Sequence, residues 1–373
     1  MPDGKKVSGR ILYGAGTLFA VCVMAFAAIN QPEQLIEGRN DFMPLYTGAR
    51  LLDEGRLYGN EHLLEREAEL TGFVSDTHGY IRAPFVAAMM WPLSRLPYRT
   101  ALRVWQIASL SAVLAFVWLW DRQQRRLVAL VTFASIPVLL AWLAGQDILF
   151  LLLVIALCIR LHQAGKPMAA GALFALCAAK PHLFLLTPIW ILGLRDREFL
   201  KGLLLCGGAL AVISTAVAGW SWPMEMFSET TNPRFSPSVS YMPNLHGALS
   251  LLPSSAFWEI LVSAVAAGAV FLISIRAHFL PAFAAGLLGG MLLARHSYVM
   301  DLAILIPALL IVLRHTISPV IKIAAAILLT PPLMLMAVQH ALYAAFTTAL
   351  CWLLLVGWAW EWMGHDRLAA PTR

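Results

Sequence analysis

The chain has 373 residues, of which 60% are hydrophobic and only 13% are charged, and its mean hydropathy of +0.72 excludes an ordinary soluble domain. Its net charge of +6 does not indicate nucleic-acid binding, because the cations form short clusters between apolar runs rather than one basic patch with interleaved aromatic residues. Such clusters are typical of topology signals under the positive-inside rule. The composition therefore predicts an integral membrane protein without a nucleic-acid partner.

The first apolar run, residues 11–30, has the length of about 20 residues that a bilayer core of roughly 30 Å requires. It follows a basic N-terminus, so we expect a retained transmembrane helix that starts in the cytoplasm. Residues 31–83 then contain ten acidic residues and five arginines, which predicts a first loop outside the cytoplasm. Within this loop, Phe42 to Arg56 has apolar residues at helical spacing and Gly55 near its end, which predicts a helix along the membrane surface.

Residues 84–361 continue with further apolar stretches, so the pattern predicts about ten to thirteen crossings in a single membrane domain covering residues 1–373. Between two of these stretches, residues 221–257 form a loop rich in Pro, Ser and Asn, expected to be irregular and on the same side as the first loop. The expected spans are 84–97, 101–120, 127–144, 147–162, 168–194, 201–220, 257–275, 279–294, 301–314, 318–337 and 342–361.

Two parts of this topology stay open. The stretch 168–194 is interrupted by Lys180-Pro181 and fits either one kinked helix or two short ones. If 84–97 and 101–120 both cross, the basic cluster Asp121 to Arg126 falls outside, against the positive-inside rule.

The first candidate for chemistry is Asp41, which follows the first predicted helix closely enough to lie at the outer membrane surface. A carboxylate at that boundary can act as a general base toward a hydroxyl group. The alternative role is an N-cap for the helix that starts at Phe42. Spacing alone favours the cap, and the two roles are compatible.

Two cations form the next candidates. Arg82 precedes the helix-starting Pro84 and can hold a lipid phosphate through paired donors, with a topology or snorkelling role given equal weight. Lys180 lies in the middle of an apolar stretch, where a charge is costly. We therefore favour ligand contact for Lys180 over internal pairing with a carboxylate such as Asp147 or Asp301.

Further polar groups interrupt the apolar segments. Gln146 lies at the edge of one segment, and His182 follows Lys180. The run from Arg295 to Asp301 separates two other segments with a high density of polar residues. A single His is usually structural, but in this setting His296 with a nearby Asp can orient a phosphate or share a proton.

Known catalytic and metal motifs are missing from the sequence. It has no Walker loop, GxSxG, HExxH or DxD-like pair, and its five cysteines lie in apolar segments without zinc-ligand spacing. The sequence therefore predicts no metal site and no cofactor.

The order of several short motifs resembles glycosyltransferase family 87, whose members are membrane enzymes of the GT-C superfamily that use polyprenyl-phosphate sugars. The resemblance covers roughly residues 10–315 and rests on order and spacing, because each motif alone is weak. The motifs are Asp41-Phe42, Tyr46, Ala49 to Leu52, Gly55 to Tyr58, Tyr80 to Phe85, Pro92-Leu93, Leu96-Pro97, Gly145-Gln146, Ala170-Gly171, Lys180-Pro181 and His296 to Leu302.

The resemblance implies an all-α GT-C bundle around a cavity open to the outer face, with surface helices in the first loop. It also implies that the acidic residue after the first helix, Asp41, is the catalytic base. Two departures leave the sugar and acceptor open: Ala83 precedes Pro84 where many members have Pro-Pro, and Ala294-Arg295 stands where Ser-Pro is usual. The predicted roles are catalysis by Asp41 and His296, donor-phosphate binding by Arg82 and Lys180, and substrate binding by Tyr46, Tyr58, Gln146, His182, Tyr298 and Asp301.

The predicted reaction transfers a hexose, with mannose as the expected sugar, from a polyprenyl-phosphate donor to a hydroxyl of a lipid-linked or glycan acceptor. Direct displacement would invert the anomeric configuration, and cations would stabilise the leaving phosphate without a metal. The expected location is the bacterial inner membrane, with the active site facing the periplasm. The alternatives are a lipid-linked sugar flippase or other secondary transporter, and a non-catalytic partner in an envelope-assembly complex.

Overall fold

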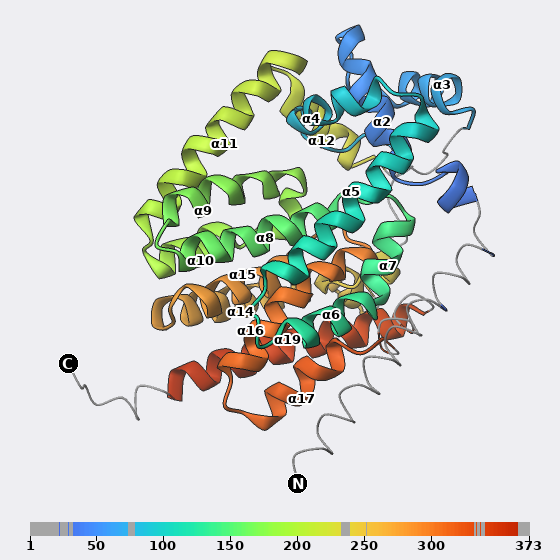
Figure 1. Cartoon of the computed structure of the whole chain (residues 1–373). Helices are drawn as coiled ribbons and strands as arrows, with labels where there is room; N and C mark the ends of the chain where they lie inside the picture. The colour runs from blue at the N-terminus through green and yellow to red at the C-terminus, as the bar shows by residue number, and fades with distance from the viewer. Residues whose placement is uncertain are drawn as a thin grey trace. The chain divides into compact units, whose positions relative to one another are not determined.

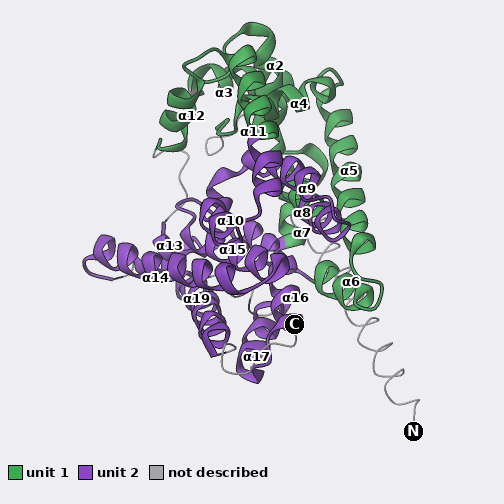
Figure 2. Ribbon diagram, turned by 90° about the vertical axis from the view of Figure 1, so that its left-hand side faces the viewer, with its two compact units in different colours: residues 1–134, 138–153, 205–236 green, residues 135–137, 154–204, 237–373 purple. Residues whose placement is uncertain are grey.

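The computed structural model of the chain describes residues 33–73, 79–232, 239–250, 252–331 and 340–364, together with the single residues 22, 29, 333 and 336. The first predicted transmembrane helix, residues 11–30, lies outside the described residues except for Cys22 and Ile29. Regular structure in the described part of the chain is entirely helical (Figure 1). The chain separates into two compact units, which Figure 2 colours green and purple.

Unit 1 comprises residues 1–134, 138–153 and 205–236, and holds the N-terminal helices. It also contains most of α7, the start of α8 and the C-terminal part of α11. Its elements are η1 (Glu33–Glu37), α2 (Phe42–Leu51), η2 (Leu52–Glu54), α3 (Asn60–Thr71), α4 (Pro84–Ser94), α5 (Tyr98–Leu119), α6 (Arg125–Phe133), α7 (Ile136–Leu143), α8 (Ile148–Gln163), α11 (Arg197–Ala218) and α12 (Trp222–Thr230).

Unit 2 comprises residues 135–137, 154–204 and 237–373. Its core contains an aromatic cluster in which Trp190 packs against Phe174, Phe199 and Phe283 at ring distances of 5.9, 5.2 and 5.5 Å. Its further elements are α9 (Pro167–Phe174), η3 (Ala175–Ala179), η4 (Pro181–Phe184), α10 (Thr187–Leu194), η6 (Val239–Tyr241), α13 (Leu245–Leu249), α14 (Ser255–Arg276), α15 (Phe279–Leu293), η7 (Val299–Ile304), α16 (Leu305–His315), α17 (Pro319–Leu328) and α19 (Ala341–Gly364).

Four helices, α5, α11, α14 and α19, are long and apolar enough to cross a membrane, and the bent pair α6–α7 passes the same test when taken together. Helix α11 exposes large apolar side chains such as Leu204 and Val212, at 64% and 69%, as expected for a helix surrounded by lipid. Six apolar helical segments of the described chain are shorter. The prediction of an all-α polytopic membrane protein is confirmed.

The length of helix α4 bears on the open question about the basic cluster that follows α5. Its 11 residues span about 16 Å at 1.5 Å per residue, which is too short for a bilayer core of roughly 30 Å. If α5 crosses the membrane, the chain enters it from the side of the first loop. Asp121 to Arg126 would then lie on the opposite side from that loop, as the positive-inside rule requires.

Helix α2 corresponds to the helix predicted from Phe42 onward, and other helices cover it. The helical segment begins at Phe42 and ends at Gly55, whose φ of 63° stops it as the sequence suggests. However, almost every residue of α2 is buried, and the helix packs against α3 and α4, beside which Figure 1 shows it. Protein therefore covers most of this helix, and its position along the membrane surface stays a prediction.

The stretch 168–194 consists of two short helical pieces, α9–η3 and η4–α10, which meet at Lys180-Pro181. Helix α9 crosses α11 closely: a Cβ added at Gly171 would lie 1.9 Å from the carbonyl oxygen of Phe199, and one at Gly202 would lie 1.8 Å from that of Met168. Glycine allows such close backbone contact between helices in a membrane. The Ala170-Gly171 motif thus has a packing role.

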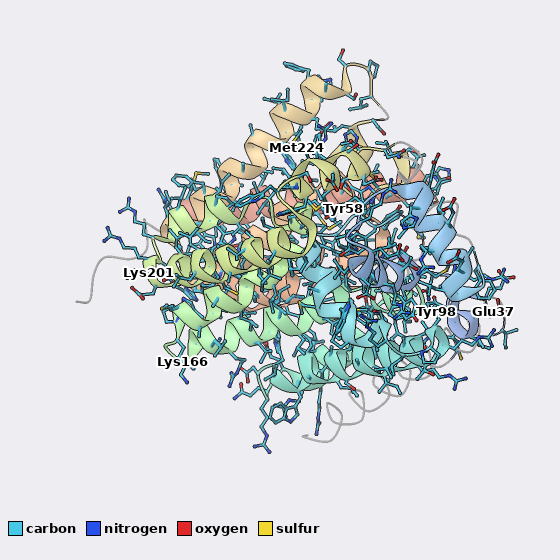
Figure 3. The ribbon with its side chains drawn as sticks, turned by 90° about the horizontal axis from the view of Figure 1, so that it is seen from above. Glu37, Tyr58, Tyr98, Lys166, Lys201 and Met224 are labelled. Atoms are coloured by element: carbon cyan, nitrogen blue, oxygen red, sulfur yellow. The ribbon has the colours of Figure 1, made fainter. Side chains whose placement is uncertain are left out.

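Unit 2 has a basic end. There His162 at the end of α8 lies 2.8 Å from Asp196 and stacks on Phe279, the first residue of α15, at 3.6 Å. Figure 3 shows Lys166 and Lys201 on this side. Arg195 directly follows α10, Arg197 begins α11 and Arg276 ends α14. Because α15 starts at this end and α10 finishes here, Lys180-Pro181 and His296 lie at the opposite end.

Candidate active site

The turn that carries Asp41 is fixed to the turn between α7 and α8. The backbone N–H of Asp41 donates to the carbonyl of Ala144 at 2.9 Å, and the side-chain amide of Asn40 donates to that of Leu143 at 2.9 Å. The Asn40 side-chain oxygen accepts from the N–H of Phe42 at 3.0 Å. These bonds hold the start of α2 in register with the α7–α8 turn, 103 residues away in sequence.

The Asp41 side chain makes no capping hydrogen bond to α2, so the N-cap role that spacing favours is wrong. Instead, Asp41 Oδ2 accepts a hydrogen bond from the side-chain amide of Gln146. Asn40 supplies the bond to the N–H of Phe42 in its place. The half-buried Asp41 carboxylate therefore serves a tertiary contact rather than the local helix.

Gly145 lets the two turns approach each other. Its φ of +66° lies in the left-handed region, and an added Cβ would lie 2.9 Å from Phe42 Cβ and 3.0 Å from Asn40 Oδ1. Its carbonyl accepts from the indole N–H of Trp105 at 2.9 Å. Gln146 consequently projects from a turn whose shape requires glycine.

Gly145→Ala is expected to destabilise the protein and reduce its activity. The left-handed conformation costs alanine roughly 1–2 kcal/mol, and overpacking against the Asp41 turn adds about 1–3 kcal/mol. Gly165→Ala is the matched control, because Gly165 has a φ of +72° but open space around its Cβ position. Denaturant titration of both variants in bicelles measures the difference, and equal losses of stability would contradict this account of the turn.

Arg82 forms an ion pair with Asp147, the residue that follows Gln146. Its Nε donates to Asp147 Oδ2 at 2.9 Å and its Nη2 to Asp147 Oδ1 at 3.2 Å, and both side chains are largely buried. The paired donors expected for a lipid phosphate are thus directed at a carboxylate in this structure. We call Asp41, Gln146, Arg82 and Asp147 the Asp41 cluster; all four belong to unit 1.

The two predicted substrate-binding tyrosines of unit 1 use their hydroxyls on backbone carbonyls. Buried Tyr46 donates to Leu96 O at 2.7 Å, and its ring packs edge-on against Tyr98 at 5.1 Å. Buried Tyr58 donates to Arg82 O at 2.8 Å. Burial, and next the nearby Glu225 and Glu229, raise the pKa of Tyr58, so its phenol stays protonated.

Unit 2 holds the second group of predicted residues, which we call the His296 cluster: Lys180, His182, His296, Tyr298 and Asp301. Lys180 Nζ donates to Asp301 Oδ1 at 2.7 Å, and Asp301 Oδ2 accepts from the N–H of Tyr298 at 2.9 Å. The His296 ring lies 6.1 Å from that of His182 and 5.2 Å from that of Tyr298. The internal pairing of Lys180 that we considered the weaker alternative is therefore present.

The sequence analysis did not identify three polar residues near this cluster: Asn244, His246 and Glu259. Asn244 is fully buried, caps α13 through Gly247 N at 2.8 Å, and donates to Ser297 Oγ at 2.7 Å. His246 Nδ1 lies 2.9 Å from Glu259 Oε2. The Asn-Leu-His sequence in an otherwise Pro-rich loop was the available signal, since it places polar groups just after Pro243.

Within the described residues, no group of three or more His, Cys, Asp and Glu side chains is arranged to hold a metal ion. The two clusters instead consist of carboxylates matched with cations or amide donors. Each can position a hydroxyl or phosphate group through charge-assisted hydrogen bonds.

Comparison with known families matches residues 80–300 to glycosyltransferase family 87, which confirms the resemblance drawn from the motifs. The matched segment contains Arg82, Gln146, Lys180 and His296, whereas Asp41 precedes it. No curated protein and no solved structure matches the chain. Because the match covers more than half of a chain whose helices can cross a membrane several times, the protein belongs to glycosyltransferase family 87 and is a membrane glycosyltransferase.

Proposed function

We propose that the protein transfers a hexose, with mannose as the expected sugar, from a polyprenyl-phosphate donor to a hydroxyl of a lipid-linked or glycan acceptor. The observation that carries the proposal is the tertiary placement of the Asp41 carboxylate. Asp41 follows the first predicted transmembrane helix, caps nothing, and receives a hydrogen bond from Gln146. A carboxylate whose position is fixed by a tertiary contact is a candidate to take the proton of a bound hydroxyl.

In the proposed reaction, Asp41 accepts the proton of the acceptor hydroxyl as that oxygen forms its bond to the anomeric carbon. The bond between the anomeric carbon and the phosphate oxygen breaks, and its electron pair leaves with polyprenyl phosphate. The two bonds lie on opposite faces of the sugar, so the configuration inverts. Gln146 supports this step by fixing the Asp41 carboxylate through one of its oxygens.

The leaving phosphate needs positive charge, and Arg82, Lys180 and His296 are the proposed sources. Arg82 and Lys180 each face an aspartate in the structure, so either would bind phosphate by sharing that carboxylate partner. His182 and His296, which are only partly buried, complete the set. Tyr46 and Tyr58 in unit 1, and Tyr298 and Asp301 in unit 2, are the proposed substrate contacts of each unit.

The proposed orientation places the chemistry on the outer side of the bacterial inner membrane. The acidic first loop and the cation-rich end of unit 2 have opposite preferences under the positive-inside rule. The basic end of unit 2 would therefore face the cytoplasm, and the end with His296 would face the periplasm. The Asp41 turn, as part of the first loop, would face the periplasm as well.

The donor class is tested by incubating the purified protein in lipid with radiolabelled polyprenyl-phosphate mannose and a membrane lipid extract. GDP-mannose serves as the matched donor that carries the same sugar on a nucleotide. We expect labelled product from the polyprenyl-phosphate donor only. Transfer from GDP-mannose alone, or from no member of a panel of polyprenyl-phosphate hexoses, would contradict the proposal.

Transfer is expected to continue at an unchanged rate in EDTA. Mg²⁺ and Mn²⁺ prefer clustered oxygen ligands, and the described residues contain no suitable set of acidic side chains. Initial rates measured with and without the chelator test this prediction. A loss of activity that added Mg²⁺ or Mn²⁺ restores would overturn the metal-free mechanism.

A further inference from the structure

Unit 1 contains a cavity of about 480 Å³, and of its lining residues only Tyr58 has been given a role above. It lies between the loop Gly55 to Gly59 and helix α12, and both walls belong to the same unit. Figure 3 labels Tyr58, which lines the cavity from the loop, and Met224 on α12. The volume falls in the range of about 300–1,000 Å³ that small-molecule sites occupy.

The polar lining is mixed in chemistry. Glu225 and Glu229 are four residues apart on α12 and so share one face of that helix, beside the hydroxyls of Ser221 and Ser228. Arg56 lines the opposite wall. Carboxylates accept hydrogen bonds from hydroxyl groups, while guanidinium and serine groups donate to ring and hydroxyl oxygens. These are the complementary groups that a molecule with several adjacent hydroxyls requires.

The cavity is linked to the candidate base indirectly, through a series of contacts within unit 1. Tyr58, which lines it, donates to the backbone carbonyl of Arg82 at 2.8 Å. The Arg82 side chain pairs with Asp147, and the preceding residue, Gln146, donates to Asp41. A ligand in the cavity would therefore contact Tyr58, which is hydrogen-bonded to the segment that carries Arg82.

We propose that this cavity binds the polyhydroxyl headgroup of an uncharged glycan acceptor, with Glu225 and Glu229 as the residues that select it. This inference rests on the proposed function and names the acceptor class for the same site. Two carboxylates against one arginine give the cavity a negative balance. A phosphate-bearing headgroup is disfavoured there, because its charge would lie near like charges.

Binding is tested without any need for turnover. Methyl glycosides of mannose, glucose and galactose are titrated into wild-type protein in nanodiscs and observed by saturation-transfer NMR, beside the corresponding hexose 6-phosphates. We expect at least one methyl glycoside to bind at least ten-fold more tightly than its 6-phosphate. The double variant Glu225→Gln/Glu229→Gln should weaken that binding at least ten-fold.

Two further variants sharpen the binding test. Ser228→Trp fills the cavity without changing its charge and should also abolish binding. Glu61→Gln removes an exposed carboxylate of α3 outside the cavity and should leave binding unchanged. Unaltered glycoside binding in the Glu225/Glu229 double variant, or tighter binding of the 6-phosphates in wild type, would overturn the proposal.

Transfer kinetics separate the acceptor headgroup from the donor hexose, which has similar hydroxyls. The double variant should raise the acceptor KM at least ten-fold and leave the donor KM unchanged; the reverse would assign the cavity to the donor and overturn the proposal. If glycoside binding responds as expected but no polyprenyl-phosphate hexose is a donor, the cavity assignment stands and the proposed function fails. If transfer occurs with an unchanged acceptor KM, the cavity assignment fails alone.

Discussion

Asp41→Asn is expected to abolish glycosyl transfer while the protein remains folded and still binds its donor. Asparagine has nearly the same shape and can still accept a hydrogen bond from Gln146, so the contact at the α7–α8 turn is kept. It cannot take a proton from the acceptor hydroxyl. Loss of a general base typically reduces rates by about 10²–10⁴-fold, so kcat should fall by that factor with little change in the donor KM.

Asp53→Asn is the matched control for this experiment. Asp53 lies in the same loop and pairs with Arg95 at an exposed position, outside the Asp41 cluster. Its activity should remain within about two-fold of wild type, as is usual for surface changes that remove no buried partner. Full activity in Asp41→Asn would exclude Asp41 as the base.

The Asp41→Asn variant also distinguishes a glycosyltransferase from a flippase. A transporter moves its lipid without breaking the glycosidic bond, so it needs no base at Asp41. We expect that neither the wild-type protein nor Asp41→Asn moves a fluorescent polyprenyl-phosphate sugar across proteoliposome bilayers. Translocation that persists in Asp41→Asn, without product formation by wild type, would favour the transporter.

Much of the fold could be predicted because hydrophobic length and periodicity are local properties. The helical segment from Phe42 to Gly55 and the break at Lys180-Pro181 both follow from residues that are visible in sequence. What cannot be predicted locally is what covers a helix. Nearly all of α2 is buried by other parts of the protein, although its pattern alone was compatible with a surface position.

Helix length also has to be measured rather than inferred from hydropathy. The segment 127–144 has enough apolar residues for one span, yet it forms α6 and α7 with a bend of 58°. The structure ends α6 at Phe133 and begins α7 at Ile136, followed by Pro137. A proline in the first turn of a helix is compatible with a break at that point.

For the candidate site, sequence identified residue types better than partners. Asp41 and Gln146 were both selected, but their contact joins positions 105 residues apart, and no spacing rule predicts it. Helix-start chemistry instead favoured a cap at Asp41, because Asp is a common N-cap residue. Tertiary contact prevailed since Asn40 satisfies the local N–H of Phe42 and leaves Asp41 for Gln146.

The buried Lys180–Asp301 pair gives the largest expected effect on stability. Both side chains are only 2–3% exposed, and the ion pair joins η7 to the break between η3 and η4. Removal of one partner leaves an uncompensated buried charge, which typically costs about 3–5 kcal/mol. Lys180→Met and Asp301→Asn should each lower the free energy of unfolding by that amount in a denaturant titration.

The double variant Lys180→Met/Asp301→Asn should be less destabilised than either single variant, because it leaves no buried charge behind. Lys201→Met, which breaks the exposed pair with Glu198, should cost less than about 1 kcal/mol. Strictly additive losses in the double variant would show that the two charges do not stabilise each other.

The folded double variant then separates structure from catalysis at Lys180. If Lys180 contacts the donor phosphate, its loss should raise the donor KM even though the fold has recovered, because phosphate binding needs the positive charge itself. If Lys180 only holds Asp301 and the N–H of Tyr298 in place, the donor KM should stay near the wild-type value. The phosphate-binding role would then pass to Arg82 and the two histidines, His182 and His296.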